Sequence, residues 1–298
     1  MSRSRAGGLL FGTAWLLVSI LGAALGLPLI ETLSEGSGPI PIWIRPNNAS
    51  SWWFLLGAGI IWLNGLLDDF HQLPARYRIV MQALGVAAGI LGPEEFRSSI
   101  NPFLLILIWI GLVYYINVFN FMDGTDGLAA SEGIFLVVAV FLLGFGGLAF
   151  QLLAIAVTIF LFWNLPRARM FMGDAGSNLL GYVTGIALLQ VFMSSPNLAF
   201  LLPVAFTVDT TLTLLLRMAR GQPFYVAHKE HAYQHLAGRF GHSIVLVLYS
   251  FFNLMILVMG IWINTLTGVF VTGLVVVLHI LALIVFYIAG AGRPRSDF

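Results

Sequence analysis

Residues 117–128 read Asn-Val-Phe-Asn-Phe-Met-Asp-Gly-Thr-Asp-Gly-Leu. This stretch places two carboxylates, two carboxamides and two glycines at the end of the strongly apolar segment 102–117. Polar groups of this kind are costly beside a membrane, so their presence asks for a function. We expect Gly124 and Gly127 to mark a frayed or tightly packed helix end at which the phosphates of a ligand can lie. The alternative is a polar loop built from ordinary Asp-Gly turns.

The composition indicates an integral membrane protein. Of the 298 residues, 59% are hydrophobic and only 9% are charged, whereas soluble domains carry about 25% charged residues. The chain has no cysteine, which excludes disulfides and thiolate metal sites. The net charge of +1 says nothing about partners, but the distribution of the charges along the chain is informative.

Ten apolar segments can be marked along the chain. They cover residues 8–29, 52–67, 79–92, 102–117, 129–145, 148–163, 178–193, 198–216, 244–263 and 268–289. Helical spans are expected because lipid offers no partner to open backbone groups, although several segments are shorter than the roughly 20 residues of an ideal span. The first segment could instead be the core of a signal peptide, but its length favours a span. We predict an all-α, polytopic membrane protein of about ten transmembrane helices.

Lysine and arginine are distributed very unevenly between the connecting segments. With residues 1–7 taken as inside, the inside segments hold twelve basic residues, which are Arg3, Arg5, Arg76, Arg78, Arg167, Arg169, Arg217, Arg220, Lys229, Arg239, Arg293 and Arg295. The outside segments hold only Arg45 and Arg97. This bias predicts that both termini are cytoplasmic, and it places every polar cluster of the chain on the cytoplasmic face. We expect one membrane-embedded domain over 1–298, with 217–243 as its cytoplasmic substrate loop.

Two further polar clusters follow the layout of the first. Asp68 and Asp69 end the span 52–67, where two adjacent carboxylates need a cation, a raised pKa or nearby arginines to offset their repulsion; a solvated helix end is the plain alternative. The sequence Phe171-Met-Gly-Asp-Ala-Gly-Ser177 precedes the span 178–193. Asp174 or Ser177 could therefore cap that helix, or Asp174 could bind a metal beside its N-terminus. Five carboxylates and several Asn oxygens favour Mg²⁺, or Mn²⁺, over zinc.

The histidines of the 217–243 loop allow two interpretations. His228, His231 and His235 would lie within about 60° of one another on a helix, and three histidines can bind zinc. The arginines and lysine nearby make anion binding at least as natural. Asp209, which we interpret as the only acid near the middle of a span, is either functional or a structural partner of Arg217. We assign no role in the site to His242 and His279.

Together these motifs resemble those of the polyprenyl-phosphate N-acetylhexosamine-1-phosphate transferases. The match is carried by Leu67-Asp-Asp69, residues 117–129, Asn164-Leu-Pro-Arg-Ala-Arg-Met-Phe-Met-Gly-Asp-Ala-Gly-Ser177, and Asp209-Thr with Arg217. The loop sequence Ala-His-Lys-Glu-His-Ala-Tyr-Gln at 227–234 is more similar to the O-antigen-initiating branch than to the muramoyl-pentapeptide translocase. The resemblance covers about residues 3–290.

The resemblance implies that a polyprenyl phosphate attacks the β-phosphorus of a UDP-sugar, giving polyprenyl-diphospho-sugar and UMP. It implies a Mg²⁺-dependent enzyme of the inner membrane without a nucleic-acid partner, and it allows a homodimer. Asp174 would bind the metal with Asn120, Asp68 and Asp69 would activate or orient the lipid phosphate, and Asp123 and Asp126 would contact metal or nucleotide. The substrate-binding positions would be Asn117, Asn164 and Phe171 (a candidate to stack on uracil), Arg76 and Arg78 for the lipid phosphate or pyrophosphate, and His228, Lys229 and His231 for the diphosphate or sugar.

The family usually has eleven spans, and Ser4-Arg-Ala-Gly-Gly8 is similar to the end of its first cytoplasmic motif. We therefore expect this chain to lack the first span. Two other functions stay open. A CDP-alcohol phosphatidyltransferase also uses Asp-Gly-rich motifs, but Ala129-Ala130 departs from its Ala-Arg core. A cation-coupled transporter would need acids near the midplane of several spans.

Overall fold

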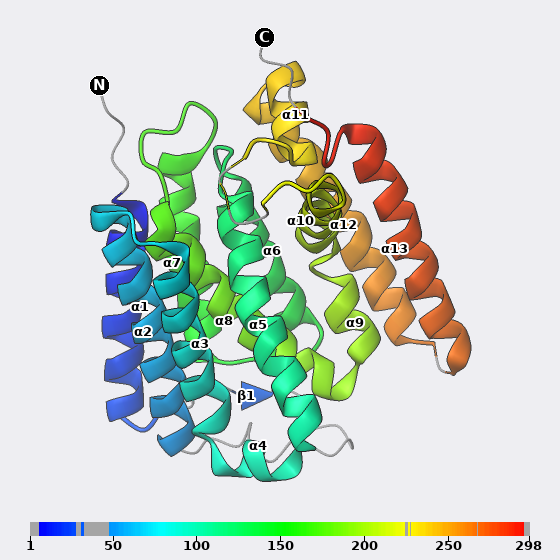
Figure 1. Cartoon of the computed structure of the whole chain (residues 1–298). Coiled ribbons are helices and arrows are strands. Elements are labelled where there is room, and N and C mark those ends of the chain that lie inside the picture. Colours follow the sequence, from blue (N-terminus) through cyan, green and yellow to red (C-terminus); the bar gives the residue numbers. More distant parts are fainter. Residues whose placement is uncertain are drawn as a thin grey trace.

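The computed structural model describes residues 6–27, 31–32, 48–223, 226, 228–266 and 268–294. Nearly all of this part of the chain is helical (Figure 1), which confirms the all-α prediction. The exception is a short antiparallel pair, in which β1 (Glu31–Thr32) lies beside β2 (Phe145–Gly146) with Glu31 opposite Gly146. Five residues used in the sequence analysis, Arg3, Ser4, Arg5, Arg45 and Arg295, lie outside the described residues.

The helices follow the apolar segments closely. The longer ones are α1 (Gly7–Ala24), α2 (Asn48–His71), α3 (Ala75–Leu91), α5 (Pro102–Met122), α6 (Leu128–Leu142), α7 (Leu148–Asn164), α8 (Gly173–Ser194), α10 (Val204–Ala219), α12 (His242–Asn264) and α13 (Val269–Ala289). Three shorter helices connect them, α4 (Glu94–Ser99), α9 (Pro196–Leu201) and α11 (Ala232–Phe240). Six described helices, α1, α2, α5, α8, α12 and α13, are long and apolar enough to cross a membrane. A polytopic membrane protein fits this finding, while the expected number of about ten spans stays a prediction.

One expected span is not continuous. The segment 198–216 divides into α9 and α10, with Leu202 and Pro203 between them. Proline has no N–H to donate, and its ring crowds the preceding helical turn, so a helix is easily interrupted there. The interruption lets α10 take a different direction from α9 (Figure 1).

Helix α8 forms the centre of the bundle. Its most apolar window is 89% buried, whereas the corresponding windows of the other five candidate spans are 22–44% buried. Small residues permit this burial, since a side chain on Gly181 would meet the backbone of Ile116 in α5, and one on Gly176 would meet Gly8 in α1. The other helices therefore surround α8 and leave apolar faces outward, as lipid-facing helices do.

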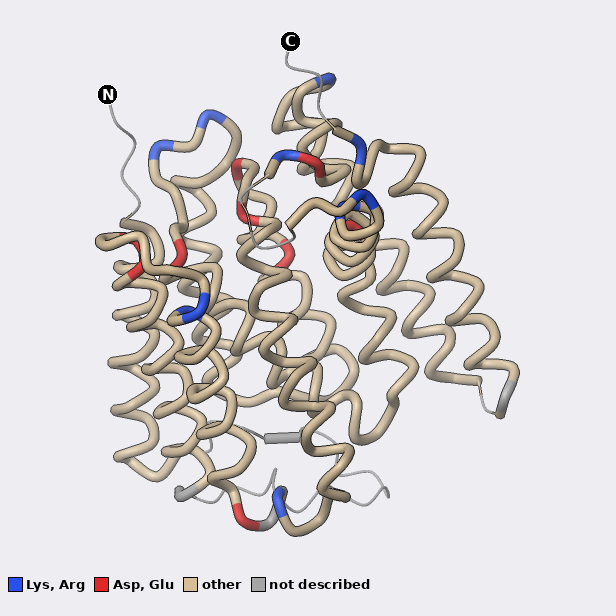
Figure 2. The backbone as a smooth tube through the Cα atoms, viewed as in Figure 1, with Lys and Arg blue, Asp and Glu red and all other residues tan. Residues whose placement is uncertain are grey.

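The charged residues gather at one end of the bundle. Figure 2 shows Lys, Arg, Asp and Glu concentrated at the end of the bundle where α1 begins and α13 ends. At the opposite end lies α4, which carries Glu94 and Arg97. The polar clusters at the end of α2, after α5 and before α8 thus share one end of the molecule, as the charge count predicts.

Candidate active site

The stretch after α5 is a tight turn against the 217–243 loop. Helix α5 ends at Met122, with Asp123 as its C-cap, and Gly127 adopts a left-handed conformation (φ 77°) before α6 begins. The hydroxyl of Tyr233 donates to the carbonyl of Phe121 over 2.9 Å. A Cβ atom on Gly124 would lie 2.2 Å from that same hydroxyl oxygen. The stretch is therefore a closely packed helix end, and Gly124 is needed for the approach.

A polar cavity of about 520 Å³ opens beside this turn. Its described lining residues are Asp123, Gly124, Thr125, Asp126, Asn164, Phe171, Gly173, Asp174 and His242. They come from the turn after α5, the end of α7, the start of α8 and the start of α12. Segments far apart in the sequence thus meet at one cavity, and its size suits a small-molecule ligand.

Asp174 lies where three other candidate residues converge. Its Oδ1 accepts a hydrogen bond of 2.8 Å from Nδ2 of Asn120, which also donates to Ser177 over 3.1 Å. Arg78 Nη1 lies 2.9 Å from Oδ2 of Asp68 and 3.7 Å from Oδ2 of Asp174. Two carboxylates from different helices therefore meet at one guanidinium, which offsets their repulsion.

Asp69 holds the start of α8. Its two carboxylate oxygens accept hydrogen bonds of 3.0 Å from the backbone N–H groups of Asp174 and Ala175. The first N–H groups of a helix have no partner within the helix, and the carboxylate accepts hydrogen bonds from two of them. Its negative charge is also stabilised by the positive end of the helix dipole. Gly173 has a φ of 72°, and a Cβ atom there would lie 2.7 Å from an Asp69 oxygen. Asp69 and Gly173 together fix the position of Asp174.

Asp126 and Asn164 hold the segment between α7 and α8 in a similar way. Oδ2 of Asp126 accepts hydrogen bonds of 3.1 Å from the backbone N–H groups of Arg167 and Ala168. Asn164 accepts from the N–H of Gly127 over 3.0 Å and donates to the carbonyl of Met170 over 2.9 Å. Both side chains are buried, so they support one wall of the cavity as well as lining it.

Asp209 holds the 217–243 loop against the bundle. It is fully buried and accepts hydrogen bonds from the N–H groups of Ala232 and Tyr233 at the start of α11, at 2.8 and 3.1 Å. Its Oδ2 also accepts a bond of 2.8 Å from the hydroxyl of Tyr249 in α12. Arg217 pairs with Glu230 instead, so the structural partner of Asp209 is the start of α11.

The three loop histidines do not share one helical face, because α11 begins only at Ala232. The rings of His228 and His231 stack with centroids 4.8 Å apart, next to the ring of Phe121. His235 instead faces the carbonyl of Arg293 at 3.0 Å. Burial, together with the nearby charges of His231 and Arg217, lowers the pKa of His228 to about 4. His228 is therefore neutral at pH 7 and offers hydrogen bonds rather than charge.

Three predicted substrate-binding residues lie away from the cavity lining. Asn117 donates to Gln82 of α3 and to the carbonyl of Val113, at 2.7 and 2.8 Å. Arg76 is exposed, and its guanidinium lies 5.0 Å from the ring centroid of Tyr77. Lys229 is exposed on the loop. Their roles stay predictions.

Two residues that the sequence interpretation passed over are important in the structure. His242, to which the sequence assigns no role, lines the polar cavity and contacts Asp126. Glu132 of α6 is a second buried acid inside an apolar helix, so the interpretation of Asp209 as the only one was wrong. Asn253 of α12 donates to Glu132 over 2.5 Å. Because an apolar helix with one acid predicts a buried polar partner, Glu132 could have been found from its own sequence context.

The described residues contain no group of three or more His, Asp or Glu side chains placed to hold a metal ion. This finding gives no support to a zinc site on the loop histidines. Mg²⁺ is commonly held by one or two carboxylates together with substrate phosphates. Asp174 and Asp68 match that smaller set of oxygen donors. The guanidinium of Arg78 lies close to both carboxylates, so positive charge is already favoured at this point of the structure.

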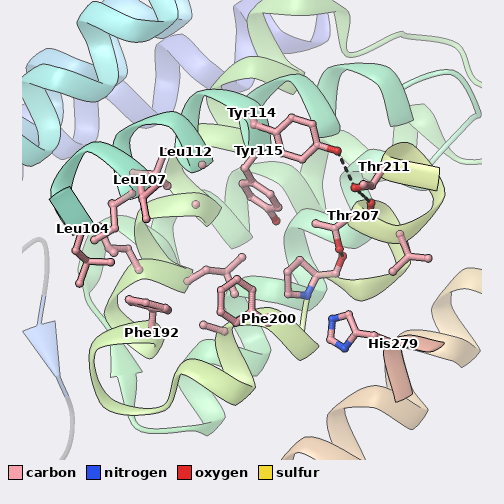
Figure 3. A pocket seen from close by; sticks show the side chains of 18 of the residues that line it. Leu104, Leu107, Leu112, Tyr114, Tyr115, Phe192, Phe200, Thr207, Thr211 and His279 are labelled. Atoms are coloured by element: carbon pink, nitrogen blue, oxygen red, sulfur yellow. Dashed lines mark hydrogen bonds between the residues drawn. The ribbon is translucent and has the colours of Figure 1, made fainter. Parts of the chain in front are cut away.

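An apolar groove of about 620 Å³ lies along α5 (Figure 3). It is lined by residues of α5, α8, α9, α10 and α13, among them Leu104, Leu107, Gly111 and Phe200. Two of its polar side chains contact each other, since the hydroxyl of Tyr114 lies 2.7 Å from that of Thr211. Tyr114 and Asn120 are six residues apart on α5, or about 9 Å along the helix axis. The groove therefore borders the part of α5 that precedes Asn120.

Comparison with known proteins identifies similar chains. The model of the family described as Glycosyl transferase family 4 matches residues 51–192. A probable undecaprenyl-phosphate N-acetylglucosaminyl 1-phosphate transferase of Bacillus subtilis is 33% identical over 221 residues, covering 65% of this chain and 61% of the relative. An undecaprenyl-phosphate alpha-N-acetylglucosaminyl 1-phosphate transferase of Thermotoga maritima is 29% identical over 210 residues, with 68% of each chain covered. A phospho-N-acetylmuramoyl-pentapeptide-transferase of Chlamydia muridarum is 29% identical over 181 residues, covering 48% of this chain and 54% of the relative.

The chain spans about 61% of the length of the Bacillus subtilis relative. The matched family segment contains Asp68, Asn120, Asp126, Asn164 and Asp174, and it ends before the 217–243 loop. The similarity therefore covers the helices that build most of the polar cavity.

Proposed function

Because the chain belongs to glycosyl transferase family 4, the family of the polyprenyl-phosphate N-acetylhexosamine-1-phosphate transferases, we propose that it transfers N-acetylhexosamine 1-phosphate from a UDP-sugar to a polyprenyl phosphate and releases UMP. The observation that supports this most is the course of α5. This helix borders the apolar groove and then brings Asn120 to Asp174 beside the polar cavity. A phosphate on a long hydrocarbon chain needs both surfaces in that order. The product would initiate a cell-surface polysaccharide of the O-antigen type.

In the proposed reaction, an oxygen of the lipid phosphate attacks the β-phosphorus of the UDP-sugar. The new P–O bond forms while the bond from the β-phosphorus to the bridging oxygen breaks, and UMP leaves with that oxygen. A lipid phosphate is already anionic at neutral pH, so its need for a general base is weak. The protein must mainly align the two phosphates and neutralise their charge.

Arg78 is the residue best placed to receive the lipid phosphate. Its guanidinium contacts Asp68 and lies near Asp174, and planar guanidinium groups bind phosphate oxygens in pairs. Asp68 is buried and also accepts the N–H of Leu73 over 2.6 Å, so its carboxylate is held in one orientation. We propose that Asp68 orients Arg78 and the attacking phosphate.

We propose that Mg²⁺ binds at Asp174, with Asp68 and Asn120 as the neighbouring oxygen donors and the substrate diphosphate completing the site. When bound, the cation would neutralise charge on the diphosphate and on the leaving UMP. Asp69 accepts the backbone N–H of Asp174 at the start of α8, and Gly173 allows its carboxylate to approach, so the position of Asp174 is fixed through the backbone. The chain thus supplies a fixed carboxylate at the mouth of the cavity.

The nucleotide would lie in the polar cavity, with the uracil against the ring of Phe171. Phe171 and Asp123 line this cavity from different segments of the chain. The cytoplasm supplies UDP-sugars, and the positive-inside bias of the chain supports an inner-membrane enzyme whose charged end, seen in Figure 2, faces that side. The stacked His228 and His231 would contact the diphosphate or sugar from the loop.

The first test is a transfer assay on the purified protein in detergent. We expect UMP release from a UDP-N-acetylhexosamine only when undecaprenyl phosphate and Mg²⁺ are both present, and we expect EDTA to abolish it. A panel of UDP-sugars under these conditions would identify the sugar. UMP release that does not depend on the lipid would contradict the proposal. A cation flux in liposomes without UMP release would favour the transporter, for which the buried acids Asp209 and Glu132 are the supporting observation.

A second prediction concerns the apolar groove. A side chain on Gly111 would meet no atom within 4 Å, so Gly111→Phe should fill the groove without disturbing the packing of α5. We expect the KM for undecaprenyl phosphate to rise about 10-fold, because burying a hydrocarbon chain contributes roughly 0.8 kcal/mol per CH₂ group. The KM for the UDP-sugar should not change.

The matched control is Gly273→Phe on α13, where a side chain also meets no atom within 4 Å and which does not line the groove. This variant should behave like the unmodified protein. Equal lipid KM values for the two variants would contradict the assignment of the groove to the polyprenyl chain.

A further inference from the structure

His242 lies at a decisive point of the polar cavity. It is the first residue of α12, its side chain is 45% exposed, and it lines the cavity with Asn164, Phe171 and Asp174. The sequence places it 116 residues after Asp126, yet the two residues touch. The ring therefore connects the loop end of the chain to the Asp-Gly turn after α5.

The hydrogen bonds of Asp126 fix the tautomer of this ring. The backbone N–H of Asp126 donates to Nδ1 of His242 over 3.3 Å, so Nδ1 must carry a lone pair. The carboxylate of Asp126 is 3.4 Å from Nδ1, but its Oδ2 already accepts from the N–H groups of Arg167 and Ala168. The neutral ring then carries its proton on Nε2, and Nε2–H is the donor that remains for a ligand.

The cavity needs such a donor because its lining is acidic. Asp123, Asp126 and Asp174 all line it, whereas a UDP-sugar brings a negatively charged diphosphate. One of the two side-chain N–H groups of Asn164 donates to the carbonyl of Met170, and the side chain is buried. Of the two nitrogen donors among the described lining side chains, His242 is the exposed one, so it is the more accessible to an anionic ligand.

We propose that His242 is a substrate-binding residue, which donates Nε2–H to an acceptor oxygen of the nucleoside diphosphate sugar. This inference rests on the proposed transferase function. It assigns His242 to the affinity for the nucleotide sugar and not to the affinity for the lipid. It also gives the contact with Asp126 a purpose, since that contact orients the ring for donation.

Two substitutions separate the two ring nitrogens. In His242→Asn, the shorter side chain can place its Oδ1 near the Nδ1 position and keep the bond from Asp126, but it loses the donor at Nε2. In His242→Gln, the amide can reach the Nε2 position, but the acceptor at Nδ1 is lost. We expect His242→Asn to raise the KM for the UDP-sugar about 10- to 100-fold, the usual range for a lost hydrogen bond to a charged group. His242→Gln should raise it less, and neither should change the KM for undecaprenyl phosphate.

The controls make each outcome decisive. His71→Asn alters an exposed histidine that does not line the cavity and should match the unmodified protein. If His242→Asn keeps the original KM while His242→Gln raises it, the ring acts only as a brace through Nδ1 and the inference is overturned. If His242→Asn does not fold, as judged by its thermal midpoint, His242→Ala takes its place, because alanine also lacks a donor at the Nε2 position. An unchanged UDP affinity of His242→Ala, measured by calorimetry, then overturns the inference. Failure of the transferase proposal would appear separately, as absent UMP release by the unmodified protein.

Discussion

Asp174→Asn is expected to reduce UMP release by at least about 100-fold, because it removes the carboxylate proposed to hold the cation and so weakens charge neutralisation at the diphosphate. The substitution also places an amide where Asp174 faces the N–H of Asn120 and the guanidinium of Arg78. The oxygen of the introduced amide can still accept one of these bonds. The backbone N–H that donates to Asp69 is retained, so the variant should remain folded.

The measurement is the initial rate of UMP release at saturating lipid, over a range of Mg²⁺ concentrations. A lost metal ligand should raise the Mg²⁺ concentration needed for half-maximal rate, as well as lowering kcat. The matched control is Glu94→Gln in α4, an exposed acid at the opposite end of the bundle. Near-normal turnover of Asp174→Asn would contradict the assignment of Asp174 as a metal ligand.

Asp69→Ala should reduce activity strongly and also destabilise the protein. It leaves the backbone N–H groups of Asp174 and Ala175 without their acceptor. The loss of a helix cap and of two hydrogen bonds to a charged group costs about 2 kcal/mol or more. Because the same turn carries Asp174, its displacement should reduce turnover even where the chain remains folded. Thermal inactivation in detergent and UMP release measure the two effects.

A second substitution at this position distinguishes a structural role of Asp69 from a chemical one. Asp69→Asn can keep one of the two bonds, so it should lose less thermal stability than Asp69→Ala. Its activity should follow its stability. If Asp69→Asn keeps the thermal midpoint of the unmodified protein but loses all activity, Asp69 contacts the reacting groups, and the role that we assign through α8 is wrong.

Asp69 is one of three aspartates with the same structural pattern. Each of them accepts hydrogen bonds from two successive backbone N–H groups of a segment elsewhere in the chain. Asp69 binds the start of α8, Asp126 binds Arg167 and Ala168, and Asp209 binds the start of α11. Backbone N–H groups that lie in apolar surroundings without a partner are costly, so a buried carboxylate is an effective acceptor. These three side chains hold the walls of the site in place.

The class of fold and the gathering of the polar residues at one end of the bundle could both be predicted from the residues alone. The hydrophobicity of a segment and the number of Arg and Lys residues in a connecting segment are local properties of the sequence. They can therefore be determined without knowing which helices are in contact. The glycines of the 117–128 stretch likewise predicted a frayed or tightly packed helix end, because glycine is required wherever a side chain has no space. Gly124 beside Tyr233 confirms that prediction.

The packing of the helices, in contrast, determines which carboxylates face the cavity and which hold backbone. Asp68 and Asp69 are neighbours in the sequence, yet Asp68 contacts Arg78 and Asp69 contacts a helix start 105 residues away. The partner of a carboxylate is fixed by the packing of distant segments, and residue type and spacing carry no information about it. His242 shows the same limit, since its role depends on Asp126 and on the cavity that the other helices form around it.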